Sequence, residues 1–175
     1  MRKLDYNMFI VILFTLICSG CEGKICVEMT NESNDTIWCY SGYSHSEFGN
    51  TVLAVNKVEI DKRGGIAKVI NPGDSAECIS EFVGFGNFNF KSHIESYGPI
   101  HIFVFKKDTI NIYGETTALN NHSYEVEYVL YSDRVIKNTG RSDHGKVVYP
   151  PTQVMMDAGV GIFYPEDVPP GPDHR

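Results

Sequence analysis

The chain has 175 residues, of which 42% are hydrophobic and 21% are charged, a composition typical of a globular protein with a packed core. This length predicts one domain, with or without extensions. The formal net charge of -7 argues against non-specific binding to nucleic acid. A phosphate-binding face needs clustered Lys and Arg side chains, and the sequence contains no such cluster.

The N-terminal segment has the pattern of an export signal. A short basic start precedes an apolar run at residues 8–17, which is too short for a membrane-spanning helix of about 20 residues. The sequence "CSGC" at 18–21 then resembles a bacterial lipobox, with small residues at the two positions before the cut, although Cys18 stands where Leu is usual. We therefore expect residues 1–20 to be a lipoprotein signal peptide. Cys21 would carry the acyl chains that anchor the mature protein in a membrane.

Other interpretations of this cysteine pair have less support. A redox CxxC motif follows a strand and opens a helix, whereas this pair ends an apolar leader. A zinc site needs a second ligand pair, which Cys26, Cys39 and Cys78 do not provide. Ordinary secretion stays the main alternative to lipidation. Glu22 is only weakly similar to the Asp that follows the lipidated cysteine in inner-membrane lipoproteins of enterobacteria. The choice of membrane therefore stays open, and of the two the outer membrane is favoured.

Short β-type runs separated by turn clusters follow the leader, as is typical of a sandwich or barrel. Alternation places Ile25, Val27 and Met29 on one face of the first strand. The continuously apolar stretch at 100–105 suits a central strand, and "SDRVIKN" at 132–138 suits one short helix with a Ser/Asp cap. Further strands are expected at 36–43, 51–60, 65–70, 75–83, 109–114, 123–131 and 146–149. These elements predict an all-β fold, an antiparallel β-sandwich of about seven to nine strands spanning residues 21–151.

The composition changes after residue 151. The end of the chain, "PEDVPPGPDHR", is Pro-rich and acidic, so residues 152–175 are expected to form an irregular extension, extended or disordered. An edge strand at 159–164 is the alternative for the first part of this segment.

A disulfide bond is one expectation for the cysteines that remain after export, because the cell envelope is oxidising. In a first hairpin symmetric about Glu32 and Ser33, Cys26 lies opposite Cys39 and the two can pair. An odd loop centred on Ser33 would misalign them, and the alternative is that both are buried free thiols. Cys78 has no partner in either arrangement.

No catalytic or metal-binding constellation is evident in the sequence. The histidines lack metal-site spacing, and there is no G-x-S-x-G motif. His101 alternates with apolar residues and is expected to be a satisfied core or interface histidine. "RSDHGK" at 141–146 gathers Arg, Ser, Asp and His, but adjacent residues point in different directions, whereas catalytic triads assemble from distant segments. The aromatic run "EFVGFGNFNF" at 81–90, together with Tyr97, suits a buried plug better than a ligand-binding ridge, because aromatic residues usually bury. We therefore expect no catalytic residues, no metal and no cofactor.

Several dispersed motifs resemble a group of uncharacterised small lipoproteins of Bacteroides and related Bacteroidetes. They are the lipoprotein signal, "VEMTNESNDTIWCYSGY" at 27–43, a Pro-Gly turn before a strand, "IHIFVFKKDTI" at 100–110, and "YEVEYVLYSDRVIKNTG" followed by "KVVYPP". The similarity covers roughly residues 18–151. It implies an envelope location and a small β-domain, and no activity.

The same resemblance gives meaning to three short triplets. Thr36, Ser75 and Thr109 each stand in a D-[S/T]-apolar triplet, which is similar to the O-glycosylation acceptor of these bacteria. All three triplets fall at predicted turns, where a sugar can be accommodated.

Together these features predict a cell-envelope lipoprotein, anchored in the membrane through acyl chains on Cys21, with a structural or binding role and no catalytic one. No nucleic-acid partner is expected, and the sequence does not specify a protein or glycan partner. The first alternative is a surface glycan-binding module that uses exposed aromatic residues, and a hydrolase comes third. Aromatic side chains gathered on one exposed sheet face favour glycan binding, and their burial favours the structural role.

Overall fold

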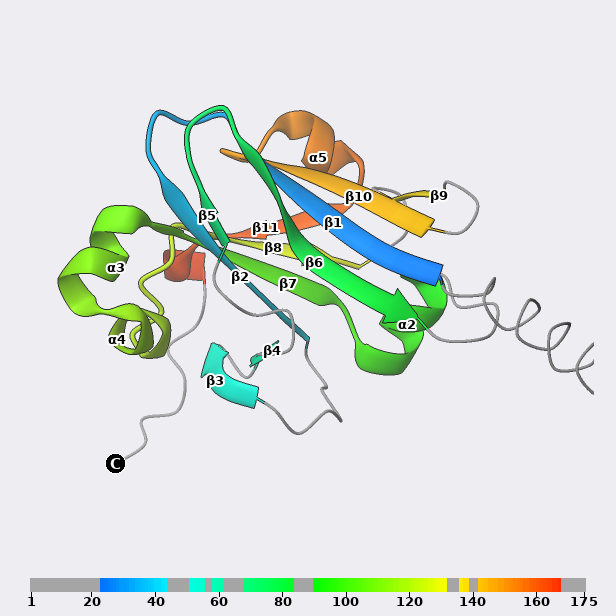
Figure 1. Ribbon diagram of the computed structural model, residues 1–175, viewed down its shortest axis with the longest axis horizontal. Coiled ribbons are helices and arrows are strands. Elements are labelled where there is room, and N and C mark those ends of the chain that lie inside the picture. Colours follow the sequence, from blue (N-terminus) through cyan, green and yellow to red (C-terminus); the bar gives the residue numbers. More distant parts are fainter. Residues whose placement is uncertain are drawn as a thin grey trace, which may run out of the picture.

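The computed structural model of the chain describes residues 23–43, 51–55, 58–61, 68–83, 90–131, 136–138 and 142–167. These residues form mostly strands, arranged in two sheets, with a few short helices (Figure 1). The small sheet contains four strands in the order β6 (Ser75–Val83), β1 (Gly23–Asn31), β10 (Ser142–Tyr149) and β9 (Ile136–Asn138). The large sheet has the order β11 (Val160–Phe163), β8 (Val126–Leu130), β7 (Ile100–Lys106), β2 (Ile37–Tyr43), β4 (Val58–Asp61) and β3 (Thr51–Val55), and β5 (Lys68–Ile70) also pairs with β2.

The main hydrophobic core lies between the inner faces of the two sheets. Ile25, Val27 and Met29 of β1 are buried in it, so the predicted alternation of this strand is confirmed. On the opposite face of β1, Lys24 pairs with Glu77 at 3.1 Å and Glu28 pairs with Lys146 at 3.8 Å. The small sheet therefore has one apolar face toward the core and one charged face toward water, the usual pattern of such sheets.

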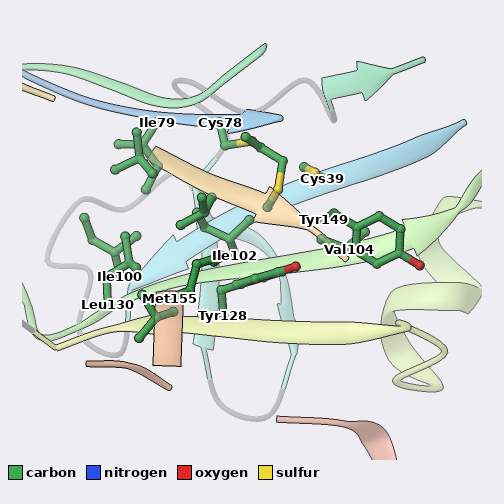
Figure 2. Close-up of a cluster of buried hydrophobic side chains, with 14 of the residues drawn as sticks. Cys39, Cys78, Ile79, Ile100, Ile102, Val104, Tyr128, Leu130, Tyr149 and Met155 are labelled. Carbon is green, nitrogen blue, oxygen red and sulfur yellow. The ribbon is translucent and has the colours of Figure 1, made fainter. Parts of the chain in front are cut away.

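The prediction of a central strand at 100–105 is confirmed by β7, which lies between β8 and β2. Its residues Ile100, Ile102 and Val104 belong to the core between the sheets, and Figure 2 shows them there beside β8 residues. Phe103 and Phe105 point to the other face of the large sheet and are fully buried as well. This burial on both faces explains why the sequence of the strand is apolar almost throughout.

Two short helices cover that other face of the large sheet. They are α3 (Lys107–Tyr113) and α4 (Glu115–Asn120), which contribute Ile110, Ala118 and Leu119 to a second cluster. The cluster contains edge-to-face aromatic contacts, with ring centroids 5.3 Å apart both for Tyr40 with Phe105 and for Phe103 with Tyr124. Two further helices, α2 (Phe90–Tyr97) and α5 (Gln153–Asp157), place Phe90 and Met155 in the main core.

The predicted hairpin between the first two strands is wrong. β1 and β2 lie in different sheets, and β1 pairs instead with β6 and β10. The pairing of β1 with β10 is parallel, so the arrangement is not purely antiparallel. The chain crosses from one sheet to the other at 32–36 because the inward faces of both strands are apolar and are buried against each other.

Three further segments differ from the sequence prediction. Residues 109–113 of the segment 109–114, which was expected to be a strand, belong to helix α3, and Gly114 follows the helix with φ 75. Residues 136–138, expected to be helical, form β9, while 132–135 lie outside the described residues. The expected irregular extension instead forms α5, β11 and a 3-10 turn (Pro165–Asp167), and β11 is the edge strand that had been the alternative. Residues 168–175 lie outside the described part.

Candidate functional site

The strand registers define two ends of the domain. At one end β1 begins, and Gly23 lies opposite Val83 while Lys24 lies opposite Ser142. We call this the Gly23 end, and it also contains the last residue of β2 and the first residue of β7. At the other end β1 finishes at Asn31, and the β1–β2 and β5–β6 connections and the β7–α3 junction meet there. We call this the Asn31 end.

The predicted lipidation residue belongs next to the Gly23 end. Cys21 itself lies outside the described residues, but only Glu22 separates it from Gly23, the first residue of β1. Two residues span at most about 7 Å. An acyl chain on Cys21, if the residue carried one, would therefore be joined to this end of the domain by a very short link. Within the described ranges, no helix is long and apolar enough to cross a membrane.

The Asn31 end brings together the three residues predicted to accept a sugar. The backbone N–H of Lys107 donates to the carbonyl of Thr36 at 3.0 Å, which joins the β1–β2 loop to the start of α3, where Thr109 lies. Ser75 opens β6, and the preceding carbonyl of Asp74 accepts from the N–H of Asn31 at 2.9 Å. The sequence predicted that each acceptor lies at a turn but not that all three share one end.

The hydroxyl groups of these acceptors differ in their surroundings. Ser75 is exposed, and its Oγ lies 2.8 Å from Oγ1 of Thr30 on the neighbouring strand. Thr36 is half-buried, and its Oγ1 donates to Oδ1 of Asn71 at a longer 3.4 Å. Thr109 is also half-buried. Ser75 is therefore the most open of the three positions.

A shallow depression of about 360 Å³ lies between two of the triplets. Its walls combine two carboxylates with two ammonium groups, and Lys106 also pairs with Glu125 at 3.5 Å. Such a mixed lining can hydrogen-bond hydroxyl, carbonyl or amide groups without favouring one net charge. The depression is lined by Asn34, Asp35, Thr36, Lys106, Lys107 and Asp108.

The buried side chain of Asn31 holds the Asn31 end together. Its Nδ2 donates to the carbonyls of Asp35 and Ile70, at 2.8 and 3.0 Å. Its Oδ1 accepts from the backbone N–H and the hydroxyl of Ser33, at 3.0 and 2.7 Å. One amide thereby provides hydrogen-bond partners for polar groups of the loop that carries Thr36 and for the carbonyl of Ile70, the last residue of β5. In the sequence, Asn31 is only the first residue of the polar run "NESND" at 31–35.

Two histidines in the described ranges, His93 and His101, occupy structural positions. The Nδ1 of His101 lies 2.6 Å from Oε1 of Glu127, and both side chains are almost fully buried, so the prediction of a satisfied core histidine is confirmed. His93 is 2% exposed and packs against Tyr43 and Tyr97, with ring centroids 5.1 and 4.8 Å away. Burial lowers the pKa of His93 to about 4, so the ring is neutral at physiological pH.

The "RSDHGK" segment places its Asp and His on opposite faces of β10. Asp143 points inward, and its Oδ2 accepts from the backbone N–H of Phe90 at 2.6 Å, which satisfies a free donor in the first turn of α2. His144 is exposed on the outer face of the small sheet. The two side chains are therefore not brought together, and Arg141 lies outside the described residues. The described ranges contain no group of His, Cys, Asp and Glu side chains arranged to hold a metal ion.

The expected pairing of Cys26 with Cys39 has no geometric basis in the fold. Cys26 lies opposite Ser80 and His144 in the small sheet, and Cys39 lies opposite Val104 and Lys68 in the large sheet. Cys26, Cys39 and Cys78 are buried free thiols in the structure. Burial, with a smaller contribution from Glu77, raises the pKa of Cys26 to about 11, so its thiol is a poor nucleophile.

Most aromatic side chains in the described residues are buried. Phe90 is fully buried and Tyr97 packs against the main core, while Phe85 and Phe88 of the same aromatic run lie outside the described residues. The exposed aromatic residues belong to three separate places, namely the end of α3, the end of β8 and the residue after β11, and they are Tyr113, Tyr131 and Tyr164.

Comparison of the chain with protein families, with curated proteins and with solved structures found no match. The candidate site therefore stands on its own geometry.

Proposed function

We propose that this chain is a cell-envelope lipoprotein, anchored by acyl chains on Cys21, whose β-sandwich domain has a structural or binding role without catalysis. The resemblance to small Bacteroidetes lipoproteins forms part of this proposal, and the outer membrane is the favoured location. The observation that carries it is the position of the first strand. β1 begins at Gly23, directly after Glu22, so almost no tether would separate the domain from a lipid anchor on Cys21.

This geometry orients the domain. β1 has nine residues, so eight steps of about 3.3 Å separate its two ends by about 26 Å. With Cys21 in the membrane, the Gly23 end would face the bilayer. The Asn31 end, with its depression and the acceptors Thr36, Ser75 and Thr109, would face away from it. A sugar or a partner would then meet the domain at its most accessible end.

The burial of the aromatic residues supports the structural or binding role over the alternative of a glycan-binding module. Glycan-binding modules stack sugars on aromatic rings gathered on one exposed face. In the described part of the chain most rings lie in the two cores, and the exposed Tyr113, Tyr131 and Tyr164 lie at the end of α3, directly after β8 and directly after β11.

Metabolic labelling with an alkyne-tagged fatty acid tests the anchor. The full chain and a Cys18→Ala variant, the matched control, are produced in a Bacteroides host beside Cys21→Ala. We expect label on the first two proteins and none on Cys21→Ala. Loss of label in Cys18→Ala with retention in Cys21→Ala, or no label on any form, contradicts the proposal.

Fluorescence quenching by lipids labelled at the headgroup tests the orientation. Single cysteines for dye attachment replace Glu95 of α2, near the Gly23 end, or Asn34 at the Asn31 end, both of which are exposed. We expect strong quenching at position 95 and little at position 34. Equal quenching at both positions would show that the domain lies on its side.

A further inference from the structure

Cys39 and Cys78 come from different sheets and meet in the main core. Cys39 is on β2 of the large sheet and Cys78 is on β6 of the small sheet, with exposed fractions of 2% and 7%. Both belong to the same hydrophobic cluster, and Figure 2 shows their side chains projecting into the same part of the core. The two thiols interact, and this interaction together with burial raises the pKa of Cys39 well above its ordinary value.

A β-bulge turns Cys78 toward its partner. In the ladder between β1 and β6, Val27 pairs with Ile79 and Glu28 pairs with Glu77, so Cys78 is the extra residue between them. A bulged residue is left out of the ladder and bends its strand. As a result, Cys78 and Ile79 both belong to the core cluster although they are adjacent in sequence.

A hydrogen bond joins the two sheets at this bulge. The carbonyl of Cys78 accepts a hydrogen bond from Oγ of Ser41 at 2.9 Å. Ser41 lies two residues after Cys39 on β2, and side chains two apart on a strand share a face. Some Cα atoms of β2 and β6 also lie within 8 Å of each other, whereas packed sheets are usually about 10 Å apart.

We propose that Cys39 and Cys78 form a disulfide bond between the two sheets when the chain folds in an oxidising compartment, an inference that rests on the export proposed above. One thiolate attacks a disulfide-bonded oxidant, a protein or small-molecule disulfide, to form a mixed disulfide and release one donor thiol. The second thiolate attacks that mixed disulfide, which closes the Cys39–Cys78 bond and releases the second donor thiol. The chain loses two electrons and two protons, and the donor gains both.

The timing of this reaction follows from burial. Neither thiol is accessible once the sheets have closed, and the raised pKa of Cys39 disfavours its thiolate in the folded state. Oxidation therefore takes place during folding, before the core is complete. Cys26 does not compete, because it lies on the other face of the small sheet, near Glu77 and Lys24.

Counting of thiols in the native protein tests the bond in the cell. Envelope fractions containing the full chain are denatured and treated with a polyethylene-glycol maleimide, with and without earlier reduction. A chain that has lost Cys18 and carries lipid on Cys21 keeps three of its five cysteines as possible thiols. We expect one label before reduction and three after it. The matched control Cys26→Ser should give none before reduction and two after it.

Refolding in vitro tests the pair independently of export. The full chain with Cys18→Ser and Cys21→Ser is refolded in oxidised glutathione, and its peptides are mapped. A peptide linking Cys39 to Cys78 is expected, and it should be absent from Cys78→Ser. The same chain folded in reductant and then exposed to oxidised glutathione should form it at least tenfold more slowly.

The outcomes separate the two proposals. Three labels both before and after reduction overturn the disulfide and leave the lipoprotein proposal standing. Five labels in each sample overturn lipidation and export, and the refolding experiment then decides the pairing alone. Refolding that gives no bond, or a bond to Cys26, overturns the inference whatever the location of the protein.

Discussion

Replacing Asn31 by Ala should weaken the whole fold, although the residue lies in a short polar connection. The side chain is completely buried and makes four hydrogen bonds, with donor–acceptor distances between 2.7 and 3.0 Å. Its partners are the carbonyls of Asp35 and Ile70 and two groups of Ser33. Removing the amide leaves the Ile70 carbonyl without this donor in a buried position, while the partners nearer the surface can turn to water.

The expected cost follows from these surroundings. A buried group without its partner costs about 1–3 kcal/mol, and an ordinary hydrogen bond contributes about 0.5–1.5 kcal/mol, so Asn31→Ala should lose about 3 kcal/mol. With a urea m-value of about 2 kcal/mol/M, the midpoint of unfolding should fall by about 1.5 M. The matched control Ser33→Ala removes only the hydroxyl and should cost about 1 kcal/mol. Equal midpoints for the two variants would refute the view that Asn31 organises this end.

Two further predictions concern buried ionisable side chains. Because burial lowers the folded pKa of His93 to about 4 from 6.5, the unfolded chain takes up this proton first on acidification. Because of His93, the free energy of unfolding therefore decreases by up to about 3 kcal/mol as the pH falls from 6.5 to 4. Urea titrations at several pH values should show a smaller decrease in this free energy for His93→Phe. Glu127→Ala leaves His101 without its 2.6 Å partner and should lower the free energy of unfolding by about 3 kcal/mol, whereas a change below about 1 kcal/mol would show that water replaces the carboxylate.

The sequence predicted those elements whose side-chain pattern reflects burial. Ile25, Val27 and Met29 alternate because one face of β1 meets the core and the other meets water. The stretch 100–105 lacks alternation because β7 is covered on both faces. In both strands the burial of each face can be read from the residues themselves.

The partners of the strands were less accessible to prediction. Adjacent strands often form hairpins, and that expectation placed β1 beside β2. The actual neighbours of β1 begin at Ser75 and Ser142, and nothing local marks so distant a pairing. The prediction of a strand at 109–114 was wrong for another reason. Its Ile110 and Ile112 alternate as in a strand, yet only Ile110 is buried, against α4, while Ile112 is 72% exposed.

In the candidate site too, some features could be predicted from local residues and others depend on which strands pair. Turn chemistry placed Thr36 in a connection and Ser75 beside one, but the prediction that Thr109 lies at a turn was wrong, because it lies in the first turn of helix α3. That these connections share the Asn31 end depends on which strands pair, as does the meeting of Cys39 with Cys78. The one-residue bulge that aims Cys78 inward has no signature in the sequence around it.

The place of β1 in the small sheet bears on how the proposed anchor would hold. β1 is hydrogen-bonded to β10 on one side and to β6 on the other over nearly its whole length, and it is an interior strand. A pull on acyl chains at Cys21 would act along the axis of this strand, starting at Gly23. The load would then shear two ladders at once instead of peeling hydrogen bonds one by one from an edge. An anchor joined to β9 or β11, which are edge strands, would lack this resistance.

A bond between Cys39 and Cys78 would add a covalent link from β6, the neighbour of β1, to the large sheet. With this link, β6 could not separate from the large sheet, and β1 would keep a neighbour that is covalently held to the rest of the domain.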